Sequence, residues 1–426
     1  MYPGISTSHC TITRRLKDVR SGAGKESIIA FVTTATETRQ DQLQVSPVLF
    51  EQLQEEMKKA TSITVTQRAA CPAHEMEVQQ TKEQNRCLSF LLTALHMTLM
   101  MVFVLFPPWP PRIAKKLLFR APPRGQSYHL IYGEGTDSKS TFFAREAVNQ
   151  PNVRLCLPQL LTKTIDAVDV YYHLLRSHVS ILNVEDDVFI CAVHLSCDLT
   201  RLYLGPGGKS PLLIIFCQPN SSDLGTCLLM EPNFADIADF HGCDMLFFDY
   251  PGYGVSDGQP SEYHVYKSAE IVLEYAIKEL GYKEEQIILM GFSLGTAAAI
   301  HLASITPSLG GLVLMAPFTS MLRVLFNMPN QWRSWSFDLF RSVDKAASIR
   351  CPTLVCHGSK DIISKLAHGQ VIAHEIATSE MCVVDKASHQ SLLGDRVMWD
   401  RVLDFVQKNF DMLAQWTRIV KNNPPT

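Results

Sequence analysis

The sequence has no Cys-x-x-Cys pair and no regular cysteine spacing, although it contains 12 cysteines. This absence argues against a structural zinc site and against a secreted disulfide framework, and it favours reduced thiols in the cytosol. An excess of positive charge is also missing, because 39 Lys and Arg residues stand against 42 Asp and Glu residues, for a net charge of −3. This balance gives no indication of a nucleic-acid partner. We expect no metal, no organic cofactor and no internal repeat.

Two segments at the start of the chain differ sharply in composition. Residues 1–86 are polar, rich in Thr, Gln and Glu, and lack sustained periodicity, so we expect a disordered leader. Residues 87–106 contain no Asp, Glu, Lys or Arg. A helix of this length spans about 30 Å, the thickness of a hydrocarbon core. The sequence therefore predicts an apolar membrane segment, with a buried core helix or a monotopic anchor as the alternatives.

The stretch after this apolar run combines prolines with basic residues. The proline-rich residues 107–111 would end a helix. Five cations follow, at Arg112, Lys115, Lys116, Arg120 and Arg124. Basic residues near a membrane segment favour the cytosolic side and attract anionic headgroups. Residues 87–125 are therefore interpreted as one membrane-attachment stretch, and the rest of the chain is expected on the cytosolic side.

Residues 126–418 are predicted to form one globular domain, and residues 419–426 a tail. Residues 168–172 and 188–194 have strand composition and are predicted as the first antiparallel strands. Strands and helices then alternate, with strands expected at 212–217, 244–250, 286–290, 311–315, 353–357 and 381–384, and helices at 234–240, 262–280, 295–304, 364–377 and 392–413. Such alternation predicts a mostly parallel central sheet flanked by helices.

The motif Gly291-Phe-Ser-Leu-Gly295 lies between a predicted strand and an alanine-rich predicted helix. Strand, Gly-x-Ser-x-Gly and helix is the arrangement of the nucleophile elbow in the α/β-hydrolase fold. The glycines leave room at a sharp turn, and the helix N-terminus supplies N–H groups where an oxyanion forms. The sequence therefore predicts an α/β-hydrolase fold with Ser293 as the nucleophile.

A serine nucleophile needs a general base and an acid that orients the base. In this fold the acid and then the histidine follow the serine along the chain, on loops at the carboxyl ends of strands. Asp361 and His389 fit this order and placement, so we predict a Ser293–Asp361–His389 triad, with Asp385 as the alternative acid. The remaining histidines near the site are expected to be structural: His301, His357 and His368.

The predicted oxyanion hole consists of two backbone N–H groups. One belongs to Leu294, which follows the nucleophile, and the other to the loop after the strand at 212–217. In that loop Asn220 is the candidate and Ser221 the next choice, because Pro219 has no N–H. Residues 318–343 are unusually apolar and aromatic. They are interpreted as a lid-like insertion that lines an acyl-chain site or contacts the bilayer, or else completes the core.

Further motifs make the sequence similar to a known family. They are Asp249-Tyr-Pro-Gly-Tyr-Gly-Val-Ser-Asp-Gly258, the loop 220–225, Ala316-Pro-Phe-Thr-Ser-Met-Leu-Arg323, Asp344-Lys345 and Arg112-Ile-Ala-Lys115. Together they resemble the α/β-hydrolase domain-containing protein 17 family over roughly residues 106 to 410. Members are membrane-associated serine hydrolases that remove palmitate from cysteines of proteins at the cytosolic face. The resemblance implies the same triad.

Three features depart from that family. Gln218-Pro219 stands where the family usually has His-Gly, and the stretch 386–391 lacks the usual Gly-Ala-Gly-His-Asn-Asp run. A polar leader and an apolar segment replace the family's cysteine-rich N-terminus. The mode of membrane attachment implied by the family therefore does not transfer.

We expect a membrane-attached thioesterase that removes palmitoyl groups from protein cysteines. Its expected partners are S-acylated proteins and the lipid bilayer, at the plasma membrane or endosomal membranes, with no nucleic acid. A lipid esterase or lysophospholipase with the same triad is the alternative enzyme. A non-hydrolytic membrane scaffold, suggested by Gln218-Pro219, is the alternative from another class.

Overall fold

The structure, a computed structural model, describes residues 118–158, 172–205, 207–330, 334–335 and 337–423, together with Met97, Thr98 and Met101. The chain divides into two units, Met1–Glu77 and Val78–Thr426, and every described residue lies in the second. The predicted leader and nearly all of the apolar run lie outside the described residues. Among the described residues, no helix is long and apolar enough to cross a membrane. The membrane segment stays a prediction.

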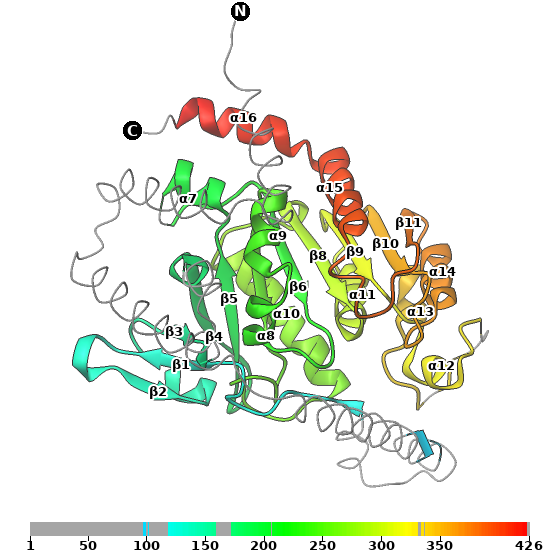
Figure 1. The fold of residues 1–426 in the computed structure, drawn as a ribbon, viewed down its shortest axis with the longest axis horizontal. Coiled ribbons are helices and arrows are strands. Elements are labelled where there is room, and N and C mark those ends of the chain that lie inside the picture. The colour runs from blue at the N-terminus through cyan, green and yellow to red at the C-terminus, as the bar shows by residue number, and fades with distance from the viewer. Residues whose placement is uncertain are drawn as a thin grey trace, which may run out of the picture. The chain divides into compact units, whose positions relative to one another are not determined.

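An eight-stranded sheet runs through the described domain (Figure 1). Its strand order is β11-β10-β9-β8-β6-β7-β5-β4. Strand β5 (Val188–Leu195) is antiparallel to both its neighbours, β4 (Ser177–Glu185) and β7 (Asp244–Phe248). The other strands pair in parallel: β6 (Leu213–Cys217), β8 (Ile287–Phe292), β9 (Gly311–Met315), β10 (Thr353–Gly358) and β11 (Ser379–Val384). This order and these directions confirm the predicted α/β-hydrolase fold.

Helices cover both faces of this sheet, and each face has its own apolar cluster. Every residue of β6 to β10 is buried, as expected for parallel strands covered on both sides. On one face lie α8 (Leu224–Leu229), α9 (Phe234–His241), α15 (Arg396–Phe410) and α16 (Met412–Asn422). On the other lie α10 (Glu262–Lys278), α11 (Leu294–Ile305), α13 (Ser342–Ala346) and α14 (Leu366–Glu375).

Several short elements complete the domain. A three-stranded antiparallel sheet of order β2-β1-β3 precedes the main sheet. Its strands are β1 (His129–Tyr132), β2 (Lys139–Thr141) and β3 (Arg154–Cys156). Further helices are α7 (Asp198–Leu204), α12 (Met321–Phe326) and the 3-10 turns η1 (Gly135–Asp137), η2 (Ala144–Ala147) and η4 (Glu284–Gln286).

Two sequence-based expectations about these elements are wrong. The predicted helix at 392–413 is two helices, α15 and α16, because Asp411 takes a left-handed conformation (φ 44°, ψ 47°) between them. Helix α16 also extends into the expected tail, as far as Asn422. The antiparallel partner of β5 is β4 rather than a strand at 168–172, of which Tyr172 is helical and the rest lies outside the described residues.

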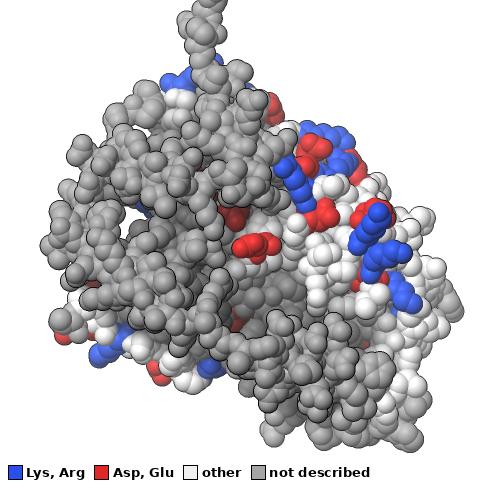
Figure 2. Space-filling view, viewed as in Figure 1, with Lys and Arg blue, Asp and Glu red and all other residues white. Residues whose placement is uncertain are grey.

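Among the described residues that Figure 2 shows, Lys and Arg side chains are interspersed with Asp and Glu side chains rather than gathered into a patch of one sign. Around α15, basic and acidic side chains lie next to one another. Glu380 on β11 contacts both Arg401 and Lys408, and Arg396 pairs with Asp400 at 3.4 Å. Such exposed pairs each contribute less than about 1 kcal/mol to stability.

Candidate active site

Ser293 lies at the sharp turn between β8 and α11. Its backbone is left-handed (φ 52°, ψ −116°), which is rare for a residue with a side chain and stores about 1–3 kcal/mol of strain. The turn is held by hydrogen bonds from the Ser293 N–H to the Met315 carbonyl and from the Thr296 N–H to the Ser293 carbonyl, each 3.0 Å long. Surrounding backbone thus fixes a strained, partly exposed serine at the carboxyl edge of the sheet.

Both glycines of the elbow are required by close backbone approach. A Cβ at Gly295 would overlap the Cys217 carbonyl at the end of β6. A Cβ at Gly291 would lie 2.6 Å from the Gly295 carbonyl oxygen. Helix α11 can therefore begin directly against the neighbouring strand, which is the role that the sequence pattern predicts for these glycines.

The structure brings the three predicted triad residues together. His389, on the loop after β11, has its Nε2 atom 2.9 Å from Ser293 Oγ. Its Nδ1 atom lies 2.6 Å from Asp361 Oδ2, on the loop after β10. Both partners are buried, with exposed fractions of 8% for His389 and 6% for Asp361. This arrangement can move a proton from the serine hydroxyl to the imidazole.

Asp361 is held as an anion. Its Oδ1 atom accepts the N–H groups of Ile363 and Ser364 at 2.9 and 3.0 Å. Burial by itself raises the pKa of Asp361, but hydrogen bonds from His357 and His389 outweigh burial and bring the pKa well below its usual value. An ionised carboxylate beside Nδ1 favours the tautomer whose Nε2 atom accepts the serine proton.

The alternative residues have other partners. His357 lies on β10 and its Nε2 donates to the Ser364 carbonyl at 2.6 Å, so it shapes the acid loop as expected. Asp385, the alternative acid, accepts from Ser359 Oγ at 3.1 Å. The two helical histidines bond elsewhere: His301 to Glu270 and Lys345, and His368 to Thr319.

The two predicted oxyanion donors follow the carboxyl ends of two neighbouring strands, β8 and β6. Leu294 is the first residue of α11, and the first N–H groups of a helix have no partner within the helix. Asn220 follows β6, the strand next to β8 in the sheet. Within the described part of the chain, the Asn220 N–H donates no hydrogen bond. Both N–H groups are thus available to a ligand oxygen.

Gln218, which stands where the family usually has His, is held in the loop after β6 by buried hydrogen bonds. Its side chain is 1% exposed and donates to Asp249 Oδ1 at 2.8 Å, while its carbonyl accepts the Tyr250 hydroxyl at 3.1 Å. Burial, and then the nearby charge of Asp223, raise the pKa of Asp249 to about 8. Sequence reasoning missed this support. The only sequence feature that pointed to Asp249 was the Asp249-Tyr-Pro-Gly motif, which was noted as part of the resemblance.

The described residues of the stretch 318–343 divide between core and surface. Phe318, Leu322 and Phe340 are buried, whereas Met328 and Phe337 are 45% and 57% exposed. Trp332 lies outside the described residues. As for metals, no group of three or more His, Cys, Asp or Glu side chains among the described residues could hold an ion.

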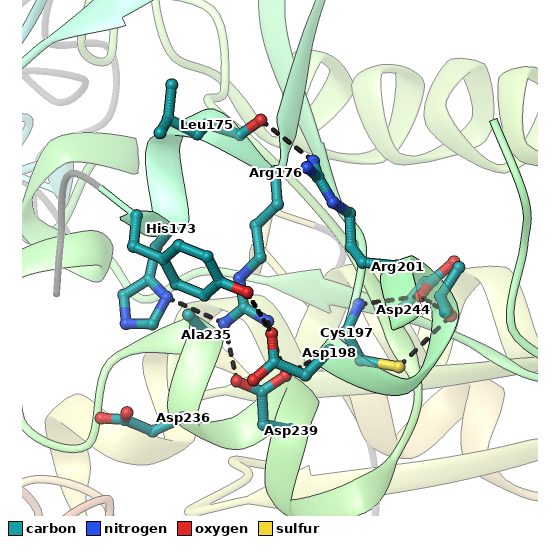
Figure 3. Close-up of polar contacts among 12 residues, drawn as sticks. His173, Leu175, Arg176, Cys197, Asp198, Arg201, Ala235, Asp236, Asp239 and Asp244 are labelled. Carbon is teal, nitrogen blue, oxygen red and sulfur yellow. Dashed lines mark hydrogen bonds and ion pairs between the residues drawn. The ribbon is translucent and has the colours of Figure 1, made fainter. Parts of the chain in front are cut away.

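A second polar cluster surrounds the buried side chain of Arg176 at the opposite, amino edge of the sheet (Figure 3). Arg176 precedes β4, and its side chain is 1% exposed. It binds Asp239 through two hydrogen bonds of 2.7 Å and Asp198 through one of 3.1 Å. Next to it His173 Nδ1 lies 2.8 Å from the guanidinium, and burial lowers the pKa of His173 to about 4. The sequence analysis did not identify this cluster.

Comparisons with known proteins agree with the α/β-hydrolase fold. A family model described as the alpha/beta hydrolase fold matches residues 210–350. Alpha/beta hydrolase domain-containing protein aho-3 of Caenorhabditis elegans is 34% identical over 53% of this chain and 64% of its own length, slightly under two thirds. Alpha/beta hydrolase domain-containing protein 17C of Xenopus laevis is 30% identical over 62% of this chain and 78% of its own. The Pyrococcus furiosus esterase Pf2001, with a TM-score of 0.44 and 17% identity over 55% of this chain and 92% of its own, is too distant to bear on function.

Proposed function

The chain belongs to the alpha/beta hydrolase domain-containing protein 17 family, and on that premise we propose that it is a membrane-attached serine hydrolase, specifically a thioesterase that removes palmitoyl groups from protein cysteines. The observation that carries this proposal is the hydrogen-bonded series Asp361–His389–Ser293 at a strained strand-to-helix turn. No metal or organic cofactor takes part.

In the proposed reaction, Ser293 Oγ attacks the thioester carbonyl carbon while His389 Nε2 takes the hydroxyl proton. The carbon–sulfur bond of the tetrahedral intermediate then breaks, and the imidazolium returns the proton to the departing cysteine sulfur. Water attacks the resulting acyl-serine ester and loses a proton to His389. Collapse of this second intermediate releases the fatty acid, and Ser293 recovers its proton. Throughout, the Asp361 carboxylate stabilises the imidazolium.

Negative charge on the former carbonyl oxygen is proposed to be stabilised by the N–H groups of Leu294 and Asn220. Donors fixed in place before the reaction need no reorganisation when charge develops. Loss of one such donor in a serine hydrolase lowers kcat by about 10²–10³. The hydrogen bonds that hold Gln218 keep this loop ordered, and this favours a working hydrolase over the non-hydrolytic scaffold.

The proposed substrates are S-acylated proteins at the cytosolic face of the plasma membrane or endosomal membranes, and the bilayer is the second partner. Of the predicted basic stretch, Arg120 and Arg124 are described and exposed. Arg124 also donates to the carbonyl oxygens of Phe142, Val255 and Ser256. The Arg124 guanidinium therefore holds this stretch against the domain by hydrogen bonds, and this role is independent of any contact with lipid. Nucleic acid has no part in the proposal.

The test is labelling of the detergent-extracted full chain with a fluorophosphonate probe, beside a Ser293→Ala variant. We expect the wild type to label and the variant not to, because only an activated serine attacks the phosphorus. A folded wild type that does not label would contradict the proposal and favour the scaffold. Offering an acyl-cysteine peptide and a lysolipid side by side then identifies the substrate class. A clear preference for the lysolipid would replace the thioesterase with the lipid esterase.

A further inference from the structure

The segment that enters the domain, residues 118–121, is hydrogen-bonded to the loop that carries Asn220. The Asn220 side chain accepts the Arg120 N–H at 3.1 Å and donates to the Leu118 carbonyl oxygen at 2.8 Å. A single side-chain amide thus forms hydrogen bonds with the backbone N–H and C=O groups on either side of Phe119, as the backbone of a neighbouring strand would. These contacts join residues about a hundred positions apart in the sequence.

Phe119 anchors this segment in the core. It is only 6% exposed, whereas its neighbour Arg120 is exposed. Its ring meets Phe340 edge to face, with centroids 6.1 Å apart, and belongs to the apolar cluster that packs α10 and α11 on the sheet. Burial of an aromatic side chain of this size contributes about 2–3 kcal/mol. The packing of Phe119 therefore stabilises the same segment that the Asn220 side chain holds by hydrogen bonds.

The Asn220 amide oxygen also accepts a hydrogen bond from the body of the domain. Tyr253, which is fully buried, donates its hydroxyl to Asn220 Oδ1 at 2.7 Å. Of the three hydrogen bonds that the structure gives this side chain, the entering segment supplies two. Residues 118–121 therefore supply most of the side-chain hydrogen bonds that hold Asn220, the residue whose N–H is the proposed oxyanion donor.

We propose that residues 118–121 form a strap that positions the Asn220 N–H for the oxyanion. This inference rests on the proposed function. The strap touches Asn220 and not the substrate, so Phe119 and the Asn220 side chain are positioning groups. Misplacement of a catalytic group by about 1 Å can cost about 100-fold in rate. The stretch before residue 118 is the predicted site of membrane attachment. A force on that stretch that displaces the strap would therefore move the Asn220 N–H and slow turnover, while the triad stays in place.

The experiment compares the full-length wild type with Asn220→Asp and Phe119→Ala. The first replaces the donor to the Leu118 carbonyl by a repelling oxygen, and the second removes the anchor. For both we expect kcat on a soluble acyl thioester to fall about 30- to 100-fold, with KM within about threefold. The rate of fluorophosphonate labelling should fall in parallel, because the phosphonyl oxygen occupies the same oxyanion hole.

Two matched variants separate positioning from loss of stability. Leu273→Ala removes a side chain of the same apolar cluster, on α10, that is 7% exposed. It should lower the thermal midpoint about as much as Phe119→Ala while kcat stays within about twofold. Phe119→Leu keeps an apolar anchor and should recover most of the lost kcat.

The outcomes assign failure to one proposal or the other. If the wild type labels but both strap variants, shown to be folded, label and turn over at the wild-type rate, the strap is wrong and the hydrolase stands. The strap is equally wrong if Leu273→Ala loses kcat as Phe119→Ala does. A folded wild type without labelling overturns the hydrolase and, with it, the strap.

Discussion

Both edges of the central sheet pair carboxylates with a buried partner, but the partners differ in kind. At the amino edge, Arg176 is enclosed by Asp239 and Asp198 through hydrogen bonds of 2.7 to 3.1 Å. At the carboxyl edge, Asp361 is paired with two backbone N–H groups, His357 and His389, and the second nitrogen of His389 bonds the hydroxyl of Ser293. One cluster consists of charge pairs around a buried guanidinium, and the other ends in a serine that can lose its proton.

Backbone conformation separates the two edges further. Ser293 has a positive φ, whereas none of the charged residues of the amino-edge cluster does. Strain of this kind persists where surrounding structure fixes it, and it is concentrated at functional sites. Buried charge alone is therefore a poor indicator of a site. Buried charge that leads to a strained, partly exposed nucleophile is a better one.

The sharpest test of the carboxyl edge is Asp361→Asn. The amide cannot hold the imidazole in the required tautomer, so we expect kcat to fall about 10⁴-fold. The fold should remain intact, because the substitution keeps the shape and an acceptor for Ile363 and Ser364. Steady-state kinetics and circular dichroism measure the two effects. A variant with more than about a tenth of wild-type kcat would exclude Asp361 as the orienting acid.

The matching change at the amino edge is Asp239→Asn, and it should affect stability instead. It leaves the buried guanidinium of Arg176 with Asp198 as its remaining anionic partner, and an unbalanced buried charge costs about 3 kcal/mol. Urea denaturation should show this loss while kcat stays within about twofold. A drop in kcat comparable with that of Asp361→Asn would abolish the distinction between the two edges.

Asp249 shows that a carboxyl group at the carboxyl edge can be structural. Its pKa is raised to about 8, chiefly by burial and then by Asp223, so folding takes up a proton at neutral pH. Stability should therefore fall as the pH rises from about 4 to about 8, by at most about 1.4 kcal/mol per pH unit from this group. Asp249→Asn carries no titrating proton. Its free energy of unfolding should rise relative to wild type between about pH 5 and pH 8, and parallel curves would contradict the assignment.

Much of the fold and the proposed triad could be predicted from sequence because both leave local patterns. The fully buried parallel strands are continuous apolar runs, and Ser293, Asp361 and His389 follow strand ends in the chain order of the fold. The strands β1 to β3 are three or four residues long, too short for periodicity to reveal. The Arg176 cluster and the contacts of Asn220 with Leu118 and Arg120 join distant segments, and no local pattern records such pairs.

The smallest expected effect is that of Asp385→Asn, which tests whether position at the carboxyl edge is sufficient for a catalytic role. Asp385 begins the stretch between β11 and His389, and from sequence it was the alternative acid. It is exposed, and it accepts a hydrogen bond from Ser359 Oγ, not from His389. Loss of one exposed hydrogen bond costs about 0.5–1 kcal/mol at most, so kcat and KM should stay within about twofold of wild type. A loss of kcat above about 100-fold would show that Asp385, rather than Asp361, orients the imidazole during turnover, and that hydrogen bonding in the resting site does not identify the acid.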